Sequence, residues 1–398
     1  MKIERGTADY WRASAALFLA AFSVFAAVYS VQPLLPIFAI EFGLDAASSS
    51  VALSATTATL ALSLVLVGWL GNRFNRKSLM LTTMLATASL VLAVPESGDW
   101  TSLVVVRALL GVAVCGVPAI AMVYLAEEMS NAALGLGIGL FVGGSALGGM
   151  SGRLMVGFLA EMVGWRAALT ALGVLILINA LVFLLLLPPP KTPRARTLTL
   201  PELGANMRAV LSDKALPLLV LCAFLMMGGF VAIYNYVGFR LLAPPYNLDH
   251  GQISLVFVVY LVGTLGSAWM GALAGRLGRR KVFWPLIVVM LAGLAITLLP
   301  PLWAIVLGMA VMTFAFFGAH SIASAWVARR SQNARAQGSA LYLLAYYGGS
   351  SVIGTLGGYG WSIGGWPGVV GFTAIAFGAA LLLAWRLYLL PPLIITAD

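Results

Sequence analysis

The sequence is poor in charged residues. Only 9% of its 398 residues are Asp, Glu, Lys or Arg, whereas 61% are hydrophobic. In a soluble domain roughly a quarter of the residues are charged, so this composition excludes a soluble fold whose surface is exposed to water. The charges stand in short clusters between apolar stretches of about 16 to 28 residues, which is the pattern of helices that span a bilayer.

Several chemical motifs are also missing. The two cysteines, Cys115 and Cys222, lie within apolar runs and give no disulfide framework. The apolar runs contain no His-Glu metal cluster and no Gly-x-Ser-x-Gly string, and the chain has no Gly-x-x-x-x-Gly-Lys-Ser/Thr loop for ATP. We therefore expect no enzyme, no metal site and no cofactor. Alternation of polar and apolar residues, which an outer-membrane barrel requires, is absent from the runs.

What remains is a set of apolar runs, which predicts an all-α polytopic membrane protein with twelve transmembrane helices. A polar, proline-containing linker, residues 188–213, separates two six-helix halves, residues 1–187 and 214–398. The expected spans are residues 15–39, 51–70, 79–94, 102–125, 132–159, 167–187, 216–237, 253–273, 282–299, 302–327, 339–358 and 369–385.

The positive residues predict the orientation, because Lys and Arg accumulate in short cytoplasmic loops. With the N-terminus inside, all of the 23 Lys and Arg residues except Arg107, Arg153, Arg166 and Arg240 fall on the cytoplasmic side. Both termini are then cytoplasmic, in a bacterial inner membrane. The net charge of +10 reflects this topology and anionic headgroups, so no nucleic-acid partner is expected.

An internal repeat, at an offset of about 203 residues, is the signature of a duplicated half. GWLGNRFNRK begins at Gly68 and GALAGRLGRR at Gly271. GGSALGGMSG begins at Gly143 and GGSSVIGTLGG at Gly348. A Gly-Trp pair precedes the last span of each half.

With these landmarks the chain resembles the major facilitator superfamily over essentially its whole length. The two basic loops are similar to that family's Gly-x-Leu-Ala-Asp-Arg-x-Gly-Arg-Arg signature, which implies a gating role. Asn72 replaces the usual Asp, so a carboxylate partner must come from the inner end of the fourth span. A solvated loop that only sets topology is the alternative. The gating candidates are Gly68, Asn72, Arg73, Arg76, Gly271, Arg276, Arg279, Arg280, Glu127 and Glu128.

Arg107 lies within the fourth expected span, similar to the family's Arg-x-x-x-Gly element. An intramembrane Arg costs roughly 2.5 to 3.5 kcal/mol, so it is usually retained for a partner or a water-filled cavity. Proton coupling or substrate contact is the favoured role. The alternative is that Arg107 snorkels and bonds carbonyls of a neighbouring helix.

The fifth expected span is rich in glycine and resembles the family's antiporter motif. Because Ser145 follows Gly144, the Gly-Pro pair of the exporter branch is missing, and close helix packing explains the glycines equally well. The packing candidates are Gly144, Gly148, Gly149 and Gly152.

No Asp or Glu occupies the middle of any expected span, which makes His320 in the tenth span a candidate proton carrier. A His that is merely hydrogen-bonded to a neighbouring group is the alternative. The resemblance implies that the first, fourth, seventh and tenth helices line a central cavity. Its further candidates are Tyr29, Gln32, Phe230, Tyr234 and Asn235, which suit hydrophobic or zwitterionic cargo.

The strings GGMSGRL, YNYVGFRL and AHSIASAW are similar to the YnfM-type branch of bacterial inner-membrane facilitators. This resemblance implies proton-linked efflux of a drug or metabolite by alternating access. An importer of a sugar-like or other small metabolite remains open, as does a sensor or scaffold on the same fold. We expect a monomer whose partners are a small-molecule substrate and membrane lipids, with the proton gradient as energy source.

Overall fold

The computed structural model describes residues 2–70, 74–191, 199–331 and 334–391, and they form helices almost throughout. In its described residues, the first half contains eight α-helices and two short 3-10 turns, η1 (Gln32–Leu34) and η3 (Val94–Glu96). Its helices are α1 (Ala8–Tyr29), α2 (Leu35–Glu41), α3 (Ala46–Leu70), α4 (Arg76–Ala93), α5 (Trp100–Val114), α6 (Gly116–Glu128), α7 (Asn131–Val163) and α8 (Trp165–Leu186).

The linker contains a short helix, α9 (Leu200–Ser212), which a Thr199–Glu202 capping box begins. The second half follows it. Its elements are α10 (Leu216–Leu242), α11 (His250–Ser254), η4 (Leu255–Val259), α12 (Tyr260–Leu277), α13 (Arg279–Ile296), α14 (Leu302–Arg330) and α15 (Arg335–Leu389).

Ten helical segments of the described residues are long and apolar enough to cross a membrane. One of them, α15, covers both of the last two expected spans and is interrupted by non-helical backbone at Gly364 and Gly365. Helix α13 is not among the ten, and its first turn consists of three basic residues. The first expected span bends near its C-terminal end, where α1 is followed by η1, which contains Pro33, and then by α2, which contains Pro36.

The Gly-Trp pairs of the repeat mark equivalent turns. Gly164 separates α7 from α8 with φ of 83°, and Gly365 lies in the break of α15 with φ of 55°. A side chain at these positive φ values would be strained, so glycine is required at both turns. The buried Trp165 and Trp366 follow them.

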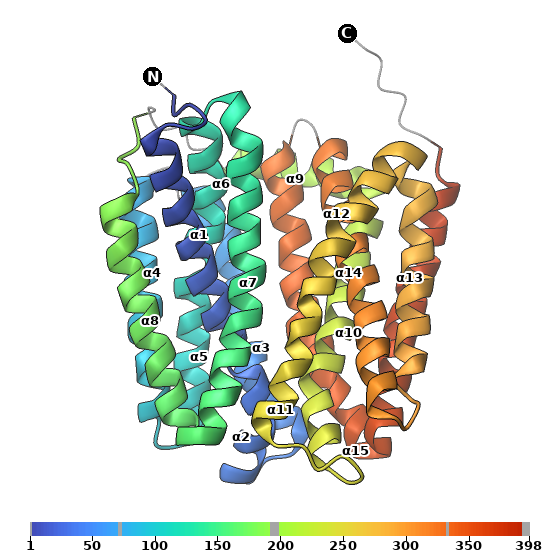
Figure 1. Cartoon of the computed structure of the whole chain (residues 1–398). Coiled ribbons are helices and arrows are strands. Elements are labelled where there is room, and N and C mark those ends of the chain that lie inside the picture. The colour runs from blue at the N-terminus through green and yellow to red at the C-terminus, as the bar shows by residue number, and fades with distance from the viewer. Residues whose placement is uncertain (1, 71–73, 192–198, 332–333, 392–398) are drawn as a thin grey trace.

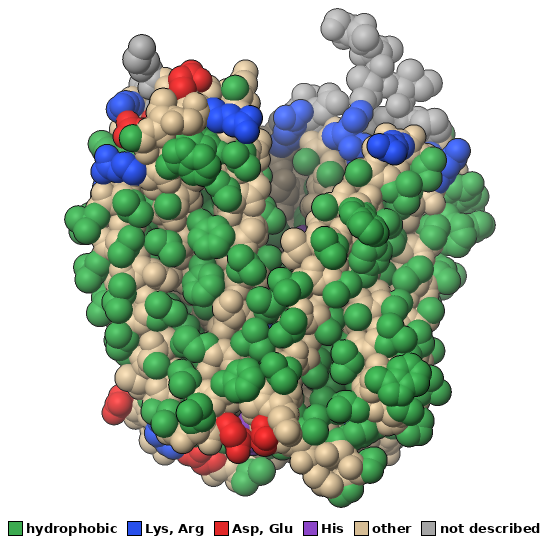
Figure 2. Space-filling model, in the orientation of Figure 1, with side chains coloured by type: hydrophobic (Ala, Val, Ile, Leu, Met, Phe, Trp, Pro, Cys, Tyr) green, Lys and Arg blue, Asp and Glu red, His purple; other side chains and the backbone are tan. Residues whose placement is uncertain are grey.

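The two halves lie side by side, α1–α8 on one side and α10–α15 on the other (Figure 1). Helix α1 begins and α15 ends at the same end of the molecule. Lys and Arg side chains gather around this end, and a furrow separates the halves there (Figure 2). Below, it is called the basic end and the opposite end the outer end.

Within the first half, α7 packs directly on α1 through Gly144, Gly148 and Gly152, which follow one another at intervals of about one turn. A Cβ on Gly144 would lie 2.5 Å from the Phe18 carbonyl oxygen, and one on Gly152 would lie 2.7 Å from the Ala26 Cα. These distances exclude any side chain, so the two backbones are in contact.

The second half repeats this packing between α15 and α10. Gly349 faces the backbone of Phe224, and a Cβ on Gly357 would lie 2.8 Å from the Ala232 side chain. The two glycines have the same spacing as Gly144 and Gly152. The sequence repeat is therefore also a repeat of helix contacts.

Replacing Gly148 by Leu tests this contact, because Gly148 faces the Phe22 backbone whereas Gly143 has open space at its Cβ position. We expect Gly148→Leu to force α1 and α7 apart and to destabilise the protein by about 1–3 kcal/mol, as overpacking typically does. The measurement is the midpoint of thermal unfolding in detergent, with Gly143→Leu as the matched control. Equal midpoints for the two variants would contradict the contact.

Candidate functional site

The basic end of the first half is held by an ion pair between α4 and α6. Arg76 donates from Nε and Nη2 to the two carboxylate oxygens of Glu127, at 2.5 and 2.6 Å, and its side chain is 3% exposed. The adjacent Glu128 accepts a hydrogen bond from the backbone N–H of Lys191. An arginine that donates two hydrogen bonds to one carboxylate forms a specific and strong ion pair. The expected residues Asn72 and Arg73 lie outside the described residues, and Gly68 lies in α3.

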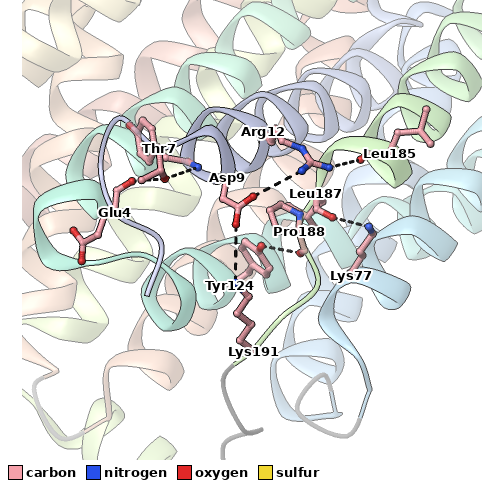
Figure 3. Close-up of polar contacts among 11 residues, drawn as sticks. Glu4, Thr7, Asp9, Arg12, Lys77, Tyr124, Leu185, Leu187, Pro188 and Lys191 are labelled. Carbon is pink, nitrogen blue, oxygen red and sulfur yellow. Dashed lines mark hydrogen bonds and ion pairs between the residues drawn. The ribbon is translucent and has the colours of Figure 1, made fainter. Parts of the chain in front are cut away.

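The start of the linker is fixed to the same end of the first half (Figure 3). Lys77 donates to the Leu187 carbonyl at 2.6 Å, and Tyr124 donates to the Pro188 carbonyl at 2.9 Å. Arg12 donates to the Leu185 carbonyl. The last turn of α8 and the first linker residues are thus bound to α1, α4 and α6.

The basic end of the second half uses a different carboxylate. Arg330, at the end of α14, donates to Asp213 Oδ1 at 2.6 Å, and Asp213 also accepts from the backbone N–H groups of Ala215 and Leu216. Arg280 donates to the carbonyls of Leu390 and Pro391. Three further gating candidates lie on two consecutive helices of the second half. They are Gly271 and Arg276 in α12 and Arg279 at the start of α13.

The hydrogen bonds that join the two halves, among the described residues, all lie in the outer half of the molecule. Gln32 donates to Asn235 at 2.7 Å, and Tyr236 donates to Ser50 at 3.2 Å. The remaining contacts are Ser50 and Ser54 with Thr355, Ser351 with the Ser54 carbonyl, and the His250 backbone N–H with Glu161. The halves are therefore joined at the outer end.

Arg107 projects from α5 toward backbone carbonyls. Its Nε donates to Ala52 at 2.9 Å, Nη1 to Ala27 at 3.0 Å and Nη2 to Val28 at 2.6 Å. The residue is 1% exposed. Every guanidinium nitrogen has an acceptor on α1 or α3, so the geometry favours the alternative in which Arg107 bonds neighbouring helices.

His320 lies on α14 among aromatic side chains. Its Nδ1 is 2.9 Å from the Tyr342 hydroxyl of α15, and its ring centroid is 4.5 Å from that of Tyr346. The ring also stacks on Phe316. Phe316 in turn stacks on Phe230 of α10 with centroids 4.0 Å apart.

The other expected cavity residues fall into two groups. Phe230 and Tyr234 belong to the aromatic cluster of the second half, where Tyr234 hydrogen-bonds Thr313 at 2.7 Å. Gln32 and Asn235 form the bond between the halves. Tyr29 lies next to them, beneath the guanidinium of a residue that the sequence reasoning did not select.

That residue is Arg153 of α7. It donates from Nε to Gln32 Oε1 and from Nη1 to the Gly149 carbonyl, both at 2.6 Å. Its Cζ lies 4.2 Å from the ring centroid of Tyr29 and 4.6 Å from that of Tyr260. The sequence signal was a single Arg in an apolar run, GGMSGRLMVGF, which topology alone did not explain.

The fold and this interface define a membrane transport protein made of two similar helical halves. The sequence profile of the Major Facilitator Superfamily matches residues 17–243 and 219–394. The chain belongs to the Major Facilitator Superfamily, as its resemblance predicted, and is a transporter rather than an enzyme. Transporters of this family need no cofactor.

Two relatives match nearly the whole chain. The uncharacterized MFS-type transporter YybF of Bacillus subtilis (strain 168) is 40% identical over 382 residues, which is 96% of this chain and 95% of the relative. The inner membrane transport protein YnfM of Escherichia coli (strain K12) is 41% identical over 386 residues, 97% of this chain and 93% of the relative.

Solved structures share the fold. A mutant of the nucleoside transporter NupG has a TM-score of 0.76 at 17% identity and covers 94% of this chain and 98% of its own. A bacterial homolog of the human lysosomal transporter Spinster, inward-facing and unoccupied, has a TM-score of 0.72 at 15% identity, with 95% of each chain covered.

Replacing Arg107 tests whether it holds helices or acts in transport. We expect Arg107→Met to lower the thermal unfolding midpoint by several degrees, because buried carbonyls of α1 and α3 lose their charged donor. Arg107→Lys should recover part of the loss, since an ammonium group supplies donors from a single point. A Met variant with normal stability but no transport would instead favour the coupling role.

Asp213 gives a pH-dependent test. Burial alone would raise its pKa, but the hydrogen bonds from Arg330, Ala215 and Leu216 outweigh burial and hold the pKa below its ordinary value. The stabilisation is then complete above the unfolded pKa of about 3.9 and is lost as pH falls through the lower folded value. We expect Asp213→Asn to lower the unfolding midpoint at pH 7 and to make no difference in strong acid.

The matched control for this variant is Asp9→Asn, because Asp9 is 43% exposed and its two ion pairs are 3.8 and 4.0 Å long. Exposed pairs contribute little, so the control should keep its midpoint at both pH values. A deficit of Asp213→Asn that persists in acid would contradict the assignment.

Proposed function

We propose that the protein exports a small organic molecule across a bacterial inner membrane in exchange for protons, by alternating access. The expected topology is part of the proposal, with both termini cytoplasmic and residues 1–187 and 214–398 as the moving halves. The twelve spans are then α1 with α2, α3, α4, α5 with α6, α7, α8, α10, α11 with α12, α13, α14 and the two parts of α15.

The position of the bonds between the halves carries this proposal. They lie in the outer half, whereas the furrow opens at the basic end (Figure 2). Positive residues face the cytoplasm, so this arrangement is an inward-facing one. Rocking of the halves about a midplane site would break the outer bonds and close the basic end. The guanidinium groups of the basic end, such as that of Arg279, would then bond helix-end carbonyls and acidic side chains across the interface and stabilise the outward-facing state.

His320 is the proposed proton carrier. Its reference pKa of about 6.5 lies close to physiological pH, and no Asp or Glu stands in the middle of an expected span. The hydroxyl of Tyr342 at 2.9 Å orients the ring and offers a partner for a proton. Partial exposure beside Tyr346 leaves the imidazole within reach of the interface between the halves.

The experiment that tests the function compares accumulation of chemically diverse dyes and drugs in energised cells with and without the protein. Lower accumulation that disappears when the proton gradient is collapsed supports proton-linked export. Higher accumulation would indicate import and overturn the proposed direction. Lower accumulation that survives the collapse would overturn proton coupling.

His320→Gln tests the coupling residue in the same cells. Glutamine keeps a hydrogen-bonding side chain but does not titrate, so we expect loss of gradient-driven export with normal membrane insertion. His250→Gln is the matched control, because it removes the other histidine of the chain at the outer end of α11 and should leave export unchanged. Full export by His320→Gln would exclude His320 as the carrier.

A further inference from the structure

Three arginines of the first half are buried, and Arg76 is paired with Glu127 whereas Arg107 and Arg153 are not paired with a described carboxylate. Arg107 and Arg153 are each 1% exposed, and neither has a carboxylate within ion-pair distance among the described residues. Arg107 uses all three nitrogens on backbone carbonyls. Arg153 uses Nε and Nη1, while its Nη2 has no hydrogen-bond partner in the described part of the chain.

The surroundings of Arg153 stabilise a positive charge without neutralising it. The rings of Tyr29 and Tyr260 lie 4.2 and 4.6 Å from its Cζ, and Phe257 lies 5.3 Å away. Such cation–π contacts attract the guanidinium, but its formal charge remains. A charged side chain inside a membrane protein is costly and is usually retained for a partner. Arg107 has carbonyl acceptors for all three nitrogens, whereas Arg153, among the described residues, keeps a free donor that a ligand carboxylate would fill.

Unpaired hydroxyls surround the same position. Tyr29 and Tyr260 are 7% and 9% exposed, and neither hydroxyl has a hydrogen-bond partner among the described residues. Tyr29 lies within electrostatic range of Arg153, Tyr260 and Tyr347. The Tyr347 hydroxyl also lacks a described partner. Hydroxyl donors beside a guanidinium are the groups that bind a carboxylate.

Arg153 lies at the interface between the two halves. Arg153 and Tyr29 belong to the first half, whereas Tyr260 and the Asn235 that bonds Gln32 belong to the second. Toward the basic end lie the partly exposed rings of Tyr346 and His320, with the buried rings of Phe316 and Phe230 packed behind them. The positive charge of Arg153 therefore lies at the outer end of this row of aromatic rings, which is called the aromatic wall below.

We propose that Arg153 is the carboxylate-binding residue of the substrate site, and that the cargo is an organic monocarboxylate with an aromatic or apolar body. This inference rests on the proposed transport function and specifies its substrate class. One carboxylate oxygen binds the free Nη2 and tyrosine hydroxyls bind the other, while the apolar body lies on the aromatic wall. A cationic cargo is repelled by the same charge.

The experiment measures binding of phenylacetate and of its neutral counterpart phenylacetamide to the purified protein in lipid nanodiscs by calorimetry. A buried charge-assisted bond contributes about 1.5 to 3 kcal/mol, so we expect phenylacetate to bind about tenfold more tightly or better. Acetate, which lacks the ring, should bind more weakly than phenylacetate. Equal binding of phenylacetate and its amide, or no saturable phenylacetate binding, would overturn the proposal.

Three variants separate the role of Arg153 from general effects. Arg153→Gln should abolish the preference for the carboxylate, and Arg153→Lys should keep the preference with weaker binding, because lysine retains the charge without the fork. Arg166→Gln removes an outer-end charge that pairs with Glu41 and should bind as the unmodified protein does. A preference that survives in Arg153→Gln would overturn the assignment.

The comparison with the amide uses unmodified protein, so it decides the proposal even where Arg153→Gln does not fold. Binding also requires no gradient and no flux. Phenylacetate binding without proton-driven export would contradict the proposed function alone, whereas proton-driven export of neutral dyes without phenylacetate binding would contradict the carboxylate site alone.

Discussion

The contact of α1 with α7, and of α10 with α15 in the second half, is the interaction on which the remaining structure depends. In hydrocarbon there is no water to satisfy backbone groups or to drive apolar surfaces together, so helices associate through close packing and internal hydrogen bonds. Glycines let α7 touch the backbone of α1, and Arg107 of α5 also binds α1 through the carbonyls of Ala27 and Val28. The outer end of α1 is thereby fixed where Gln32 meets the second half.

Strong and weak bonds are distributed in a way that suits two rocking bodies. At the basic end, the ion pair of Arg76 with Glu127 connects α4 and α6 of the first half, and that of Arg330 with Asp213 connects α14 to the last residue of the linker. Apart from the His250 N–H to Glu161 bond, the side-chain bonds between the halves join neutral groups, such as Gln32 with Asn235. A neutral hydrogen bond contributes only about 0.5 to 1.5 kcal/mol. Each half is therefore held together more firmly than the halves are held to each other.

The sequence predicted the helices and the repeat, because hydrophobic runs and glycine-rich turns are local features. It also predicted that His320, Phe230 and Tyr234 are chemically notable, but which side chains meet depends on helix rotation, which composition does not encode. Arg153 was missed for this reason. One arginine in an apolar run does not reveal whether its donors reach carbonyls, as those of Arg107 do, or remain free.

The repeat is broken where the chemistry of the interface lies. Gly152 is followed by Arg153, whereas its counterpart Gly357 is followed by Gly358, which packs against Ala47 of α3. Three residues after Ala26 comes Tyr29, and three after Ala232 comes Asn235. A symmetric pair of arginines would place two uncompensated charges at one interface, at a high cost in low dielectric. The single arginine instead gives the interface one charged point opposite neutral and aromatic groups, and so distinguishes the two ends of a bound molecule.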